Sequence, residues 1–225
     1  MGTLSLAKDA LRSMTENIGP LKVLFVCTGN ICRSAIAEQA FRARYTGESI
    51  EFTSAGVGAL VGRGMPEQAA EISRQLGGVP DAHIARQITK DMIAESDLVI
   101  ALSREHRSEI VRTHPRSNRY TFTLREFARV LESYAGDPQA TPIPRTASAA
   151  VGVFRGAIPI IASQRGFADQ PASPEGDDVI DPYRRDQEVY DRSGREISDA
   201  VERITGVIDH LRAPRGAHAA PVDPI

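Results

Sequence analysis

Two residues with complementary chemistry, Cys27 and Arg33, are separated by five residues near the start of the chain. An apolar run at 22–26 precedes the cysteine, a small polar loop follows it, and residues 33–45 have the composition of a helix. A loop that leads into a helix N-terminus points backbone N–H groups at one spot and binds anions. These groups and Arg33 favour a Cys27 thiolate, and a guanidinium holds two phosphate oxygens at once. The spacing predicts nucleophilic attack on a bound phosphoryl group, although a lone cysteine after a strand is also a common small buried residue.

The whole stretch is more specific than this spacing, because it resembles the phosphate loop of the low molecular weight protein tyrosine phosphatases. The match includes the preceding strand, Thr-Gly-Asn-Ile-Cys inside the loop, and Ser34 directly after Arg33. Ala35 stands where that family commonly has proline, which costs little because alanine is the best helix former. The resemblance implies that Cys27 is the nucleophile. It also implies a phosphate site formed by Thr28, Gly29, Asn30, Ile31, Cys32 and Arg33.

Two further stretches, Ser-Ala-Gly at 54–56 and His-Ile-Ala-Arg-Gln at 83–87, resemble the same family in the same order. Taken alone, Ser54 is a turn residue and His83 a surface histidine. In the family, the corresponding residues join the loop asparagine and the serine after the arginine in a hydrogen-bond network. The resemblance therefore implies a supporting network formed by Asn30, Ser34, Ser54 and His83.

An Asp-Pro-Tyr sequence that begins at Asp181 precedes the last predicted helix. Asp-Pro alone is a common turn, but a cysteine nucleophile needs a general acid to protonate the leaving oxygen. The resemblance assigns this role to Asp181 and implies a substrate cleft bordered by Ile31, Tyr183 and Arg184. Arg184 stands where some members have a second aromatic residue, which favours acidic peptides. The facing wall is expected from residues 58–64, which contain no aromatic side chain.

Three alternatives share parts of this pattern. Thioredoxin-coupled arsenate reductases have the same loop but need a later resolving cysteine, and none follows Cys32. Protein-arginine phosphatases resemble the chain more closely, but they carry Thr in place of Ile31, whose larger apolar side chain favours a phenyl ring over a guanidinium. A catalytically dead phosphate-binding module would lack Cys27, Arg33 or Asp181. We therefore expect a phosphotyrosine phosphatase that forms a phosphocysteine, with phosphotyrosyl proteins, and a tyrosine kinase or its targets, as partners.

The composition sets the surroundings that we expect. With 27 Lys and Arg against 29 Asp and Glu, the chain has no overall electrostatic field that would attract it to nucleic acid or membranes. Its two cysteines favour a reducing compartment, no apolar run is long enough to span a bilayer, and charged residues interrupt any signal peptide. We expect a cytoplasmic enzyme with no metal and no other cofactor, because no residues have metal-ligand spacing. Cys32 either forms a reversible disulfide with Cys27 or packs inward.

Alternating strands and helices predict an α/β fold: an open parallel sheet of about four strands, helices on both faces, and the phosphate loop after the first strand. We expect an N-terminal extension at 1–20, which reads as a short helix, and a phosphatase domain at 21–212. A Pro-, Ala- and Gly-rich insertion lies at about 136–176, either as a lid or as a surface-packed helix between linkers, and 213–225 form a disordered tail. The expected strands are 22–26, 50–53, 97–102 and 119–123, and the expected helices are 33–45, 65–77, 89–95, 103–113, 124–134 and 185–212.

Overall fold

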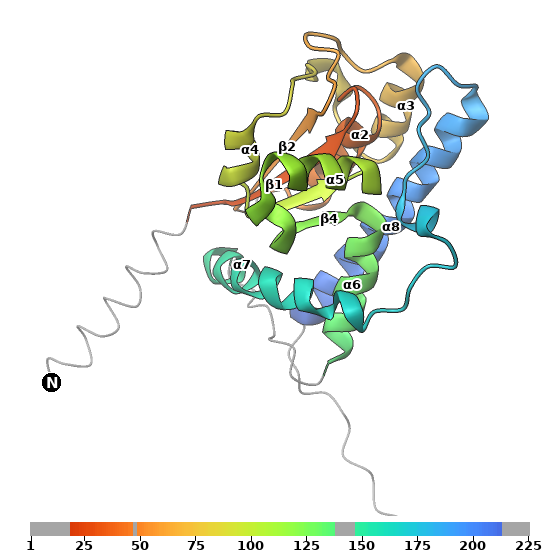
Figure 1. Cartoon of the computed structure of the whole chain (residues 1–225). Helices are drawn as coiled ribbons and strands as arrows, with labels where there is room; N and C mark the ends of the chain where they lie inside the picture. The colour runs from red at the N-terminus through yellow and green to blue at the C-terminus, as the bar shows by residue number, and fades with distance from the viewer. Residues whose placement is uncertain (1–18, 47–48, 138–146, 213–225) are drawn as a thin grey trace, which may run out of the picture.

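Four parallel strands form the centre of the molecule in the order β2-β1-β3-β4 (Figure 1). The structure is a computed structural model that describes residues 19–46, 49–137 and 147–212. The prediction of an open parallel sheet of about four strands, with the Cys27 loop after the first, is confirmed. The strands are β1 (Leu21–Cys27), β2 (Ile50–Gly56), β3 (Leu98–Ala101) and β4 (Thr121–Thr123).

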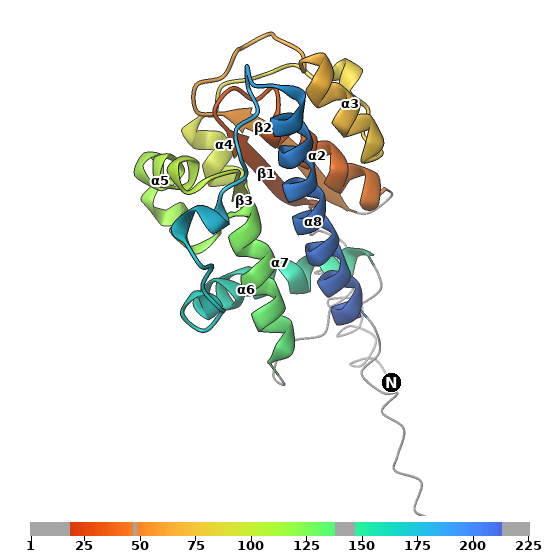
Figure 2. The same ribbon diagram turned by 90° about the vertical axis from the view of Figure 1, so that its right-hand side faces the viewer.

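Helices cover both faces of this sheet, as the sequence predicts (Figure 2). Ile93 and Ile110 pack on one face against Leu24 and Val99, while the larger core around Phe25 fills the other. The helices are α2 (Arg33–Arg44), α3 (Glu67–Gln75), α4 (Lys90–Glu95), α5 (Arg104–Thr113), α6 (Leu124–Gly136), α7 (Ala147–Ser163) and α8 (Gln187–Arg212). Four 3-10 turns join them, η1 (Pro80–Ala82), η2 (Pro115–Arg119), η3 (Gln164–Gly166) and η4 (Pro174–Asp177).

β1 is a near-continuous apolar run because it is covered on both faces. Every residue of β1 except Lys22 is buried. The strand pairs with β2 so that Cys27 lies opposite Gly56, at the carboxyl ends of both strands. The sheet thereby places the predicted nucleophile where parallel α/β sheets bind their ligands.

The predicted insertion contributes to the core. α7 lies beside α6 in both views, and its buried residues Val151, Phe154, Ile158 and Ile161 join the cluster around Phe25 (Figures 1 and 2). Among the described residues, none from α7 lines the cleft beside Cys27. The α7 part of the insertion is therefore a packed helix that does not cover this cleft.

Three predicted segments lie wholly or partly outside the described residues: the helix expected within 1–20, the tail at 213–225 and the part of the insertion at 138–146. In the part of the chain that the structure describes, no helix is both long and apolar enough to cross a lipid bilayer.

Neighbouring residues of α7 allow a matched test of its packing. Ile161 is fully buried, whereas Ile160 is 49% exposed. Ile161→Ala should lower the free energy of unfolding by about 2–5 kcal/mol because it leaves a cavity, and Ile160→Ala should change it by about 0.5 kcal/mol or less. Urea unfolding measures both. Equal effects would show that α7 is not part of the cooperative core.

Candidate active site

The loop between β1 and α2 is held from outside through its carbonyl groups. His83 Nε2 donates to Asn30 O at 2.6 Å. In a planar trans peptide the C=O and the next N–H point in opposite directions, so the N–H groups of residues 28–31 face the cleft. This arrangement makes the loop an anion site. The three carbonyls before Asn30 accept hydrogen bonds from backbone N–H groups of the segment after β2. Cys27 O accepts from Val57 N at 2.9 Å, Thr28 O from Gly58 N at 3.0 Å and Gly29 O from Leu60 N at 3.0 Å.

Asn30 is the residue at which the loop reverses. It is fully buried, and its φ of 54° lies in the left-handed region, which asparagine tolerates better than most residues. Its Nδ2 donates to Ser34 Oγ at 3.0 Å and to Ser54 Oγ at 2.8 Å, and its Oδ1 accepts from Arg86 N at 2.9 Å. The structure thus brings together the four residues of the predicted network, including His83.

Ser34 links this network to the predicted nucleophile. Ser34 Oγ lies 3.0 Å from Cys27 Sγ and accepts from Asn30, so its own hydrogen is available to the sulfur. The network continues outward, because Ser54 Oγ donates to Glu38 Oε2 at 2.6 Å and Glu38 pairs with Arg42. Glu38 was not predicted from the sequence, although it lies one helical turn after Ser34 on the same face of α2.

Gly56 is needed where β2 passes against the loop. A Cβ atom at this position would lie 2.3 Å from Thr28 O and 3.0 Å from Asn30 N. No side chain fits between these backbone segments, which gives the Ser-Ala-Gly sequence a steric reason.

Arg33 and Asp181 meet across the mouth of the loop. Arg33 is buried and donates from Nη1 to Val179 O at 3.2 Å, while its Nη2 lies 2.7 Å from Asp181 Oδ2. The Asp181 side chain is 52% exposed, and its Oδ1 accepts from Tyr183 N at 3.1 Å. The carboxyl group therefore lies at the entrance, next to the guanidinium.

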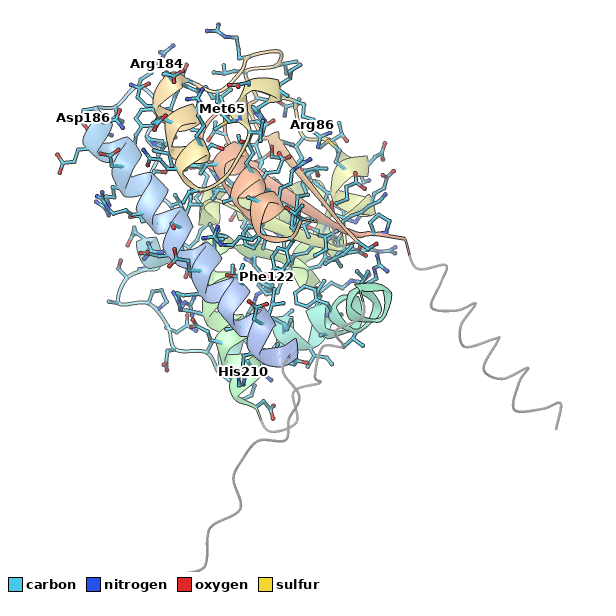
Figure 3. The ribbon with its side chains drawn as sticks, turned by 180° about the vertical axis from the view of Figure 1, so that it is seen from behind. Met65, Arg86, Phe122, Arg184, Asp186 and His210 are labelled. Atoms are coloured by element: carbon cyan, nitrogen blue, oxygen red, sulfur yellow. The ribbon has the colours of Figure 1, made fainter. Side chains whose placement is uncertain are left out.

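A cleft of about 240 Å³ opens above the loop. Its apolar walls come from Ile31, Leu60 and Tyr183, so the segment 58–64 lines the cleft through an aliphatic side chain. Arg184 does not line the cleft. Its guanidinium carbon lies 5.1 Å from the centroid of the Tyr183 ring, and Figure 3 shows Arg184 at the periphery, near the start of α8. The lining residues are Cys27, Thr28, Gly29, Ile31, Cys32, Arg33, Gly58, Leu60, Asp181 and Tyr183.

Cys32 packs inward, with its Sγ 4.0 Å from Tyr190 OH. Burial, reinforced by Cys27, raises the pKa of Cys32 to about 12, so Cys32 is a thiol at neutral pH. Neither cysteine forms a disulfide in the structure, and the Cys27–Cys32 disulfide stays a prediction.

His106 is a contact of the loop that the sequence analysis missed. Its Nε2 lies 2.9 Å from Thr28 Oγ1 and its Nδ1 lies 2.8 Å from Ser103 Oγ. Burial, with a smaller contribution from the Arg33 charge, lowers the pKa of His106 to about 3. The neutral ring therefore fixes Thr28, the first residue after the predicted nucleophile. Its position just beyond the carboxyl end of a predicted strand was the available signal.

Within the described residues, no group of three or more His, Cys, Asp or Glu side chains is arranged to hold a metal ion.

Two substitutions of Asn30 separate the contribution of its side-chain hydrogen bonds from that of its left-handed backbone. Asn30→Ala loses three side-chain hydrogen bonds. It also forces an alanine, which has no side-chain group to compensate, into the left-handed region. It should lower the free energy of unfolding by about 2–4 kcal/mol and weaken inorganic phosphate binding at least about tenfold. Asn30→Gly loses the same bonds but accepts the backbone, so urea unfolding should find it about 1 kcal/mol more stable than the alanine variant. Equal stability of the two variants would mean that the backbone conformation carries no cost.

The burial of neutral His106 predicts a pH dependence of stability. The unfolded chain binds a proton at His106 near pH 6.5, whereas the folded chain does so only near pH 3. Lowering the pH through this window therefore favours unfolding, and the stability that His106 contributes is complete only above about pH 6.5. Urea unfolding of wild type and His106→Gln, in which the other titrations cancel, should show wild type losing more stability between pH 7 and pH 4. A constant difference would contradict a buried, neutral His106.

Comparison with known proteins places the chain in a family. Residues 22–141, which are 120 of its 225 residues, match the family described as low molecular weight phosphotyrosine protein phosphatase. A protein-arginine-phosphatase of Geobacillus stearothermophilus is 33% identical over 124 residues, 55% of this chain and 82% of that protein. A low molecular weight protein-tyrosine phosphatase A of Mycobacterium tuberculosis is 46% identical over 92 residues, 39% of this chain and 55% of the relative, so the match spans about half of the relative.

The fold agrees with these matches. The solved structure of an arginine phosphatase from Geobacillus stearothermophilus superposes with a TM-score of 0.60 at 24% identity, covering 89% of this chain and 100% of that chain. The similarity in structure shows the shared fold, and the sequence matches show the shared descent. The chain therefore belongs to the low molecular weight phosphotyrosine protein phosphatase family, a family of hydrolases.

Proposed function

We propose that this phosphatase hydrolyses phosphotyrosine in proteins through a phosphocysteine on Cys27, and that residues 21–212 are its phosphatase domain. The observation that carries the proposal is the convergence of Cys27, Arg33 and Asp181 on one cleft. The family match ends at residue 141, so the role of Asp181 rests on its 2.7 Å contact with Arg33 and on the resemblance of its loop.

In the first step, the Cys27 thiolate attacks the phosphorus in line. The S–P bond forms, the P–O bond to the tyrosyl oxygen breaks, and Asp181 gives its proton to that oxygen. Arg33 and the inward N–H groups of the loop stabilise the negative charge on the equatorial oxygens throughout.

In the second step, water attacks the phosphocysteine while Asp181 accepts its proton. The S–P bond breaks, inorganic phosphate forms and Cys27 leaves as a thiolate. Ser34, 3.0 Å from the sulfur, donates a hydrogen bond to this thiolate and makes it a better leaving group.

The walls of the cleft favour an aromatic substrate. Ile31, Leu60 and Tyr183 offer apolar surface to a flat phenyl ring, whereas a guanidinium needs polar partners to leave water. The 33% identity to a named protein-arginine-phosphatase makes phosphoarginine the second candidate. We extend the proposal to a tyrosine kinase or its targets as partners. The cytoplasmic location stays a prediction.

Single-turnover dephosphorylation of matched phosphotyrosyl and phosphoarginyl peptides, without added metal, tests the proposal. We expect turnover of phosphotyrosine alone, no turnover by Cys27→Ser, and a fall of about 10²-fold or more in Asp181→Ala, because that variant lacks the general acid.

Ile31→Thr is the matched variant for substrate choice. It shortens the apolar wall and adds a hydroxyl, so the ratio of phosphotyrosine to phosphoarginine turnover should fall. Preference of the wild type for phosphoarginine would keep the mechanism and overturn the substrate. Turnover of neither peptide would overturn the proposed function.

A further inference from the structure

The chain returns from α7 to the cleft through residues 167–180, which we call the strap. The strap follows η3, passes α6 and leads directly to Asp181 (Figure 2). The position of the proposed general acid therefore depends on what holds the strap.

The end of the strap nearest the cleft is bound at consecutive residues. Val179 N donates to Leu102 O at 3.0 Å, and Val179 O accepts from Arg33 Nη1 at 3.2 Å. Ile180 N donates to Glu196 Oε2 at 2.8 Å. These contacts join the strap to α2, to α8 and to the residue that follows β3, just before the acid.

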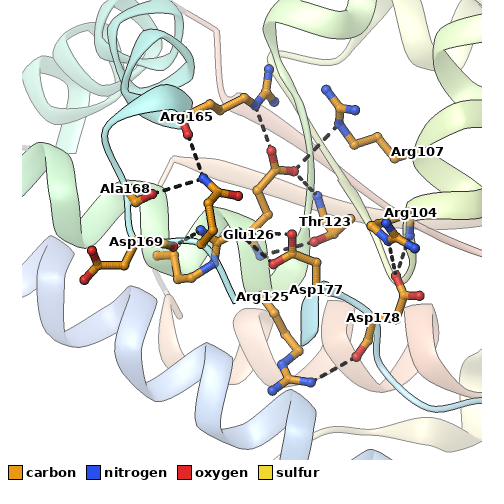
Figure 4. A network of polar contacts seen from close by, with 12 residues as sticks. Arg104, Arg107, Thr123, Arg125, Glu126, Arg165, Ala168, Asp169, Asp177 and Asp178 are labelled. Atoms are coloured by element: carbon orange, nitrogen blue, oxygen red, sulfur yellow. Dashed lines mark hydrogen bonds and ion pairs between the residues drawn. The ribbon is translucent and has the colours of Figure 1, made fainter. Parts of the chain in front are cut away.

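The two preceding residues are bound through their carboxyl groups (Figure 4). Asp178 Oδ1 accepts from the backbone N–H of Arg104 at 2.7 Å, and Asp178 O accepts from Arg125 Nη1 at 3.1 Å. Asp177 receives both of its carboxyl contacts from Arg129 Nη2, at 2.8 and 3.0 Å.

Arg129 differs from the other anchors in two ways. Its side chain makes hydrogen bonds to the strap at two points, since its Nη1 also donates to Asp169 O. Its ion pair with Asp177 is mostly shielded from water, with 16% and 14% of the two side chains exposed. A shielded carboxylate that loses its cation is driven toward water, so the loss of Arg129 would displace this end of the strap.

We propose that Arg129, which lies outside the cleft on α6, is a positioning residue for Asp181. The inference rests on the proposed function, in which Asp181 protonates the leaving oxygen. Arg129 clamps the strap at Asp169 and Asp177 and so fixes the direction from which Asp181 enters the cleft. The Arg104 side chain lies 4.0 Å from Glu175 Oε1 and 3.9 Å from Asp178 Oδ1, beyond hydrogen-bond distance, so Arg104 donates to the strap only from its backbone N–H. Arg125 supplies a single bond to a carbonyl, so Arg129 is the side chain whose removal frees the strap most.

Leaving-group dependence measures the placement of Asp181. Dinitrophenyl phosphate releases a strongly acidic phenol and needs little protonation, whereas phenyl phosphate needs a full general acid. We expect Arg129→Met to lower kcat/KM about tenfold for phenyl phosphate and less than about twofold for dinitrophenyl phosphate. Asp177→Asn, which removes the charge and keeps the shape, should show the same pattern, and Arg129→Lys should recover part of the loss.

Arg203→Met is the matched control. It breaks an arginine–carboxylate pair with Glu132, at 2.8 and 2.6 Å, that joins α8 to α6 outside the strap. This control should leave both rates unchanged. Equal losses on the two substrates in Arg129→Met and Asp177→Asn, or no loss in either, would overturn the inference. If Asp181→Asn still shows the leaving-group dependence in that case, the proposed function stands; if Cys27→Ser keeps activity, the proposed function fails.

Discussion

The site depends on one constraint: four consecutive carbonyl groups, from Cys27 to Asn30, must be bound on the outside of the loop. Only then do the following N–H groups face the substrate together. Three of these carbonyls are bound by backbone N–H groups of residues 57–60, and the fourth by the His83 ring. The parallel pairing of β1 with β2 brings the first of these partners into place, because it aligns the ends of both strands at Cys27 and Gly56.

The same constraint explains the residues around Asn30. A buried loop residue in the left-handed region lies outside any helix or strand, so its surroundings need hydrogen-bond partners from a side chain. The Asn30 amide supplies them, because it binds two hydroxyls and one backbone N–H. Because the Asn30 amide donates to Ser34, the hydroxyl of Ser34 is oriented toward Cys27. The backbone geometry of the loop and the hydrogen bond to the Cys27 sulfur thus belong to one network, so a change that relaxes the loop also changes the surroundings of the sulfur.

The sequence predicts these features to the extent that they are local or belong to a motif. The sheet and the loop follow from short patterns, since an apolar run marks β1, whereas the Asn30–Ser34 pair follows from the resemblance of the loop to the family motif. Residues 58–64 were expected only as a wall of the cleft, yet their backbone also binds the loop, which no side-chain pattern reveals. His106 and Arg129 belong to predicted helices with many charges, where solvated faces are the usual interpretation. Their partners, Thr28 and Asp177, lie far away in the sequence, so only the folded chain shows these contacts.

The predicted insertion shows how a long segment can coexist with a site that needs fixed distances. Lengthening a connection costs little chain entropy, and the buried face of α7 offsets the cost of ordering it. The chain after α7 must then come back to the cleft accurately enough for Val179 O to accept a hydrogen bond from Arg33. Arg165 provides an early anchor, because it pairs with Glu126 at 2.9 Å and lies 4.1 Å from the centroid of Phe122, which Figure 3 shows in the interior. Glu126 also caps α6 through Thr123, so this anchor starts from the rigid junction of β4 and α6. Fixed points at both ends of the strap hold Asp181 in place whatever the length of the predicted insertion before them. For that reason charged anchors are expected at 165–178, whereas the chain farther from the cleft needs only an apolar face.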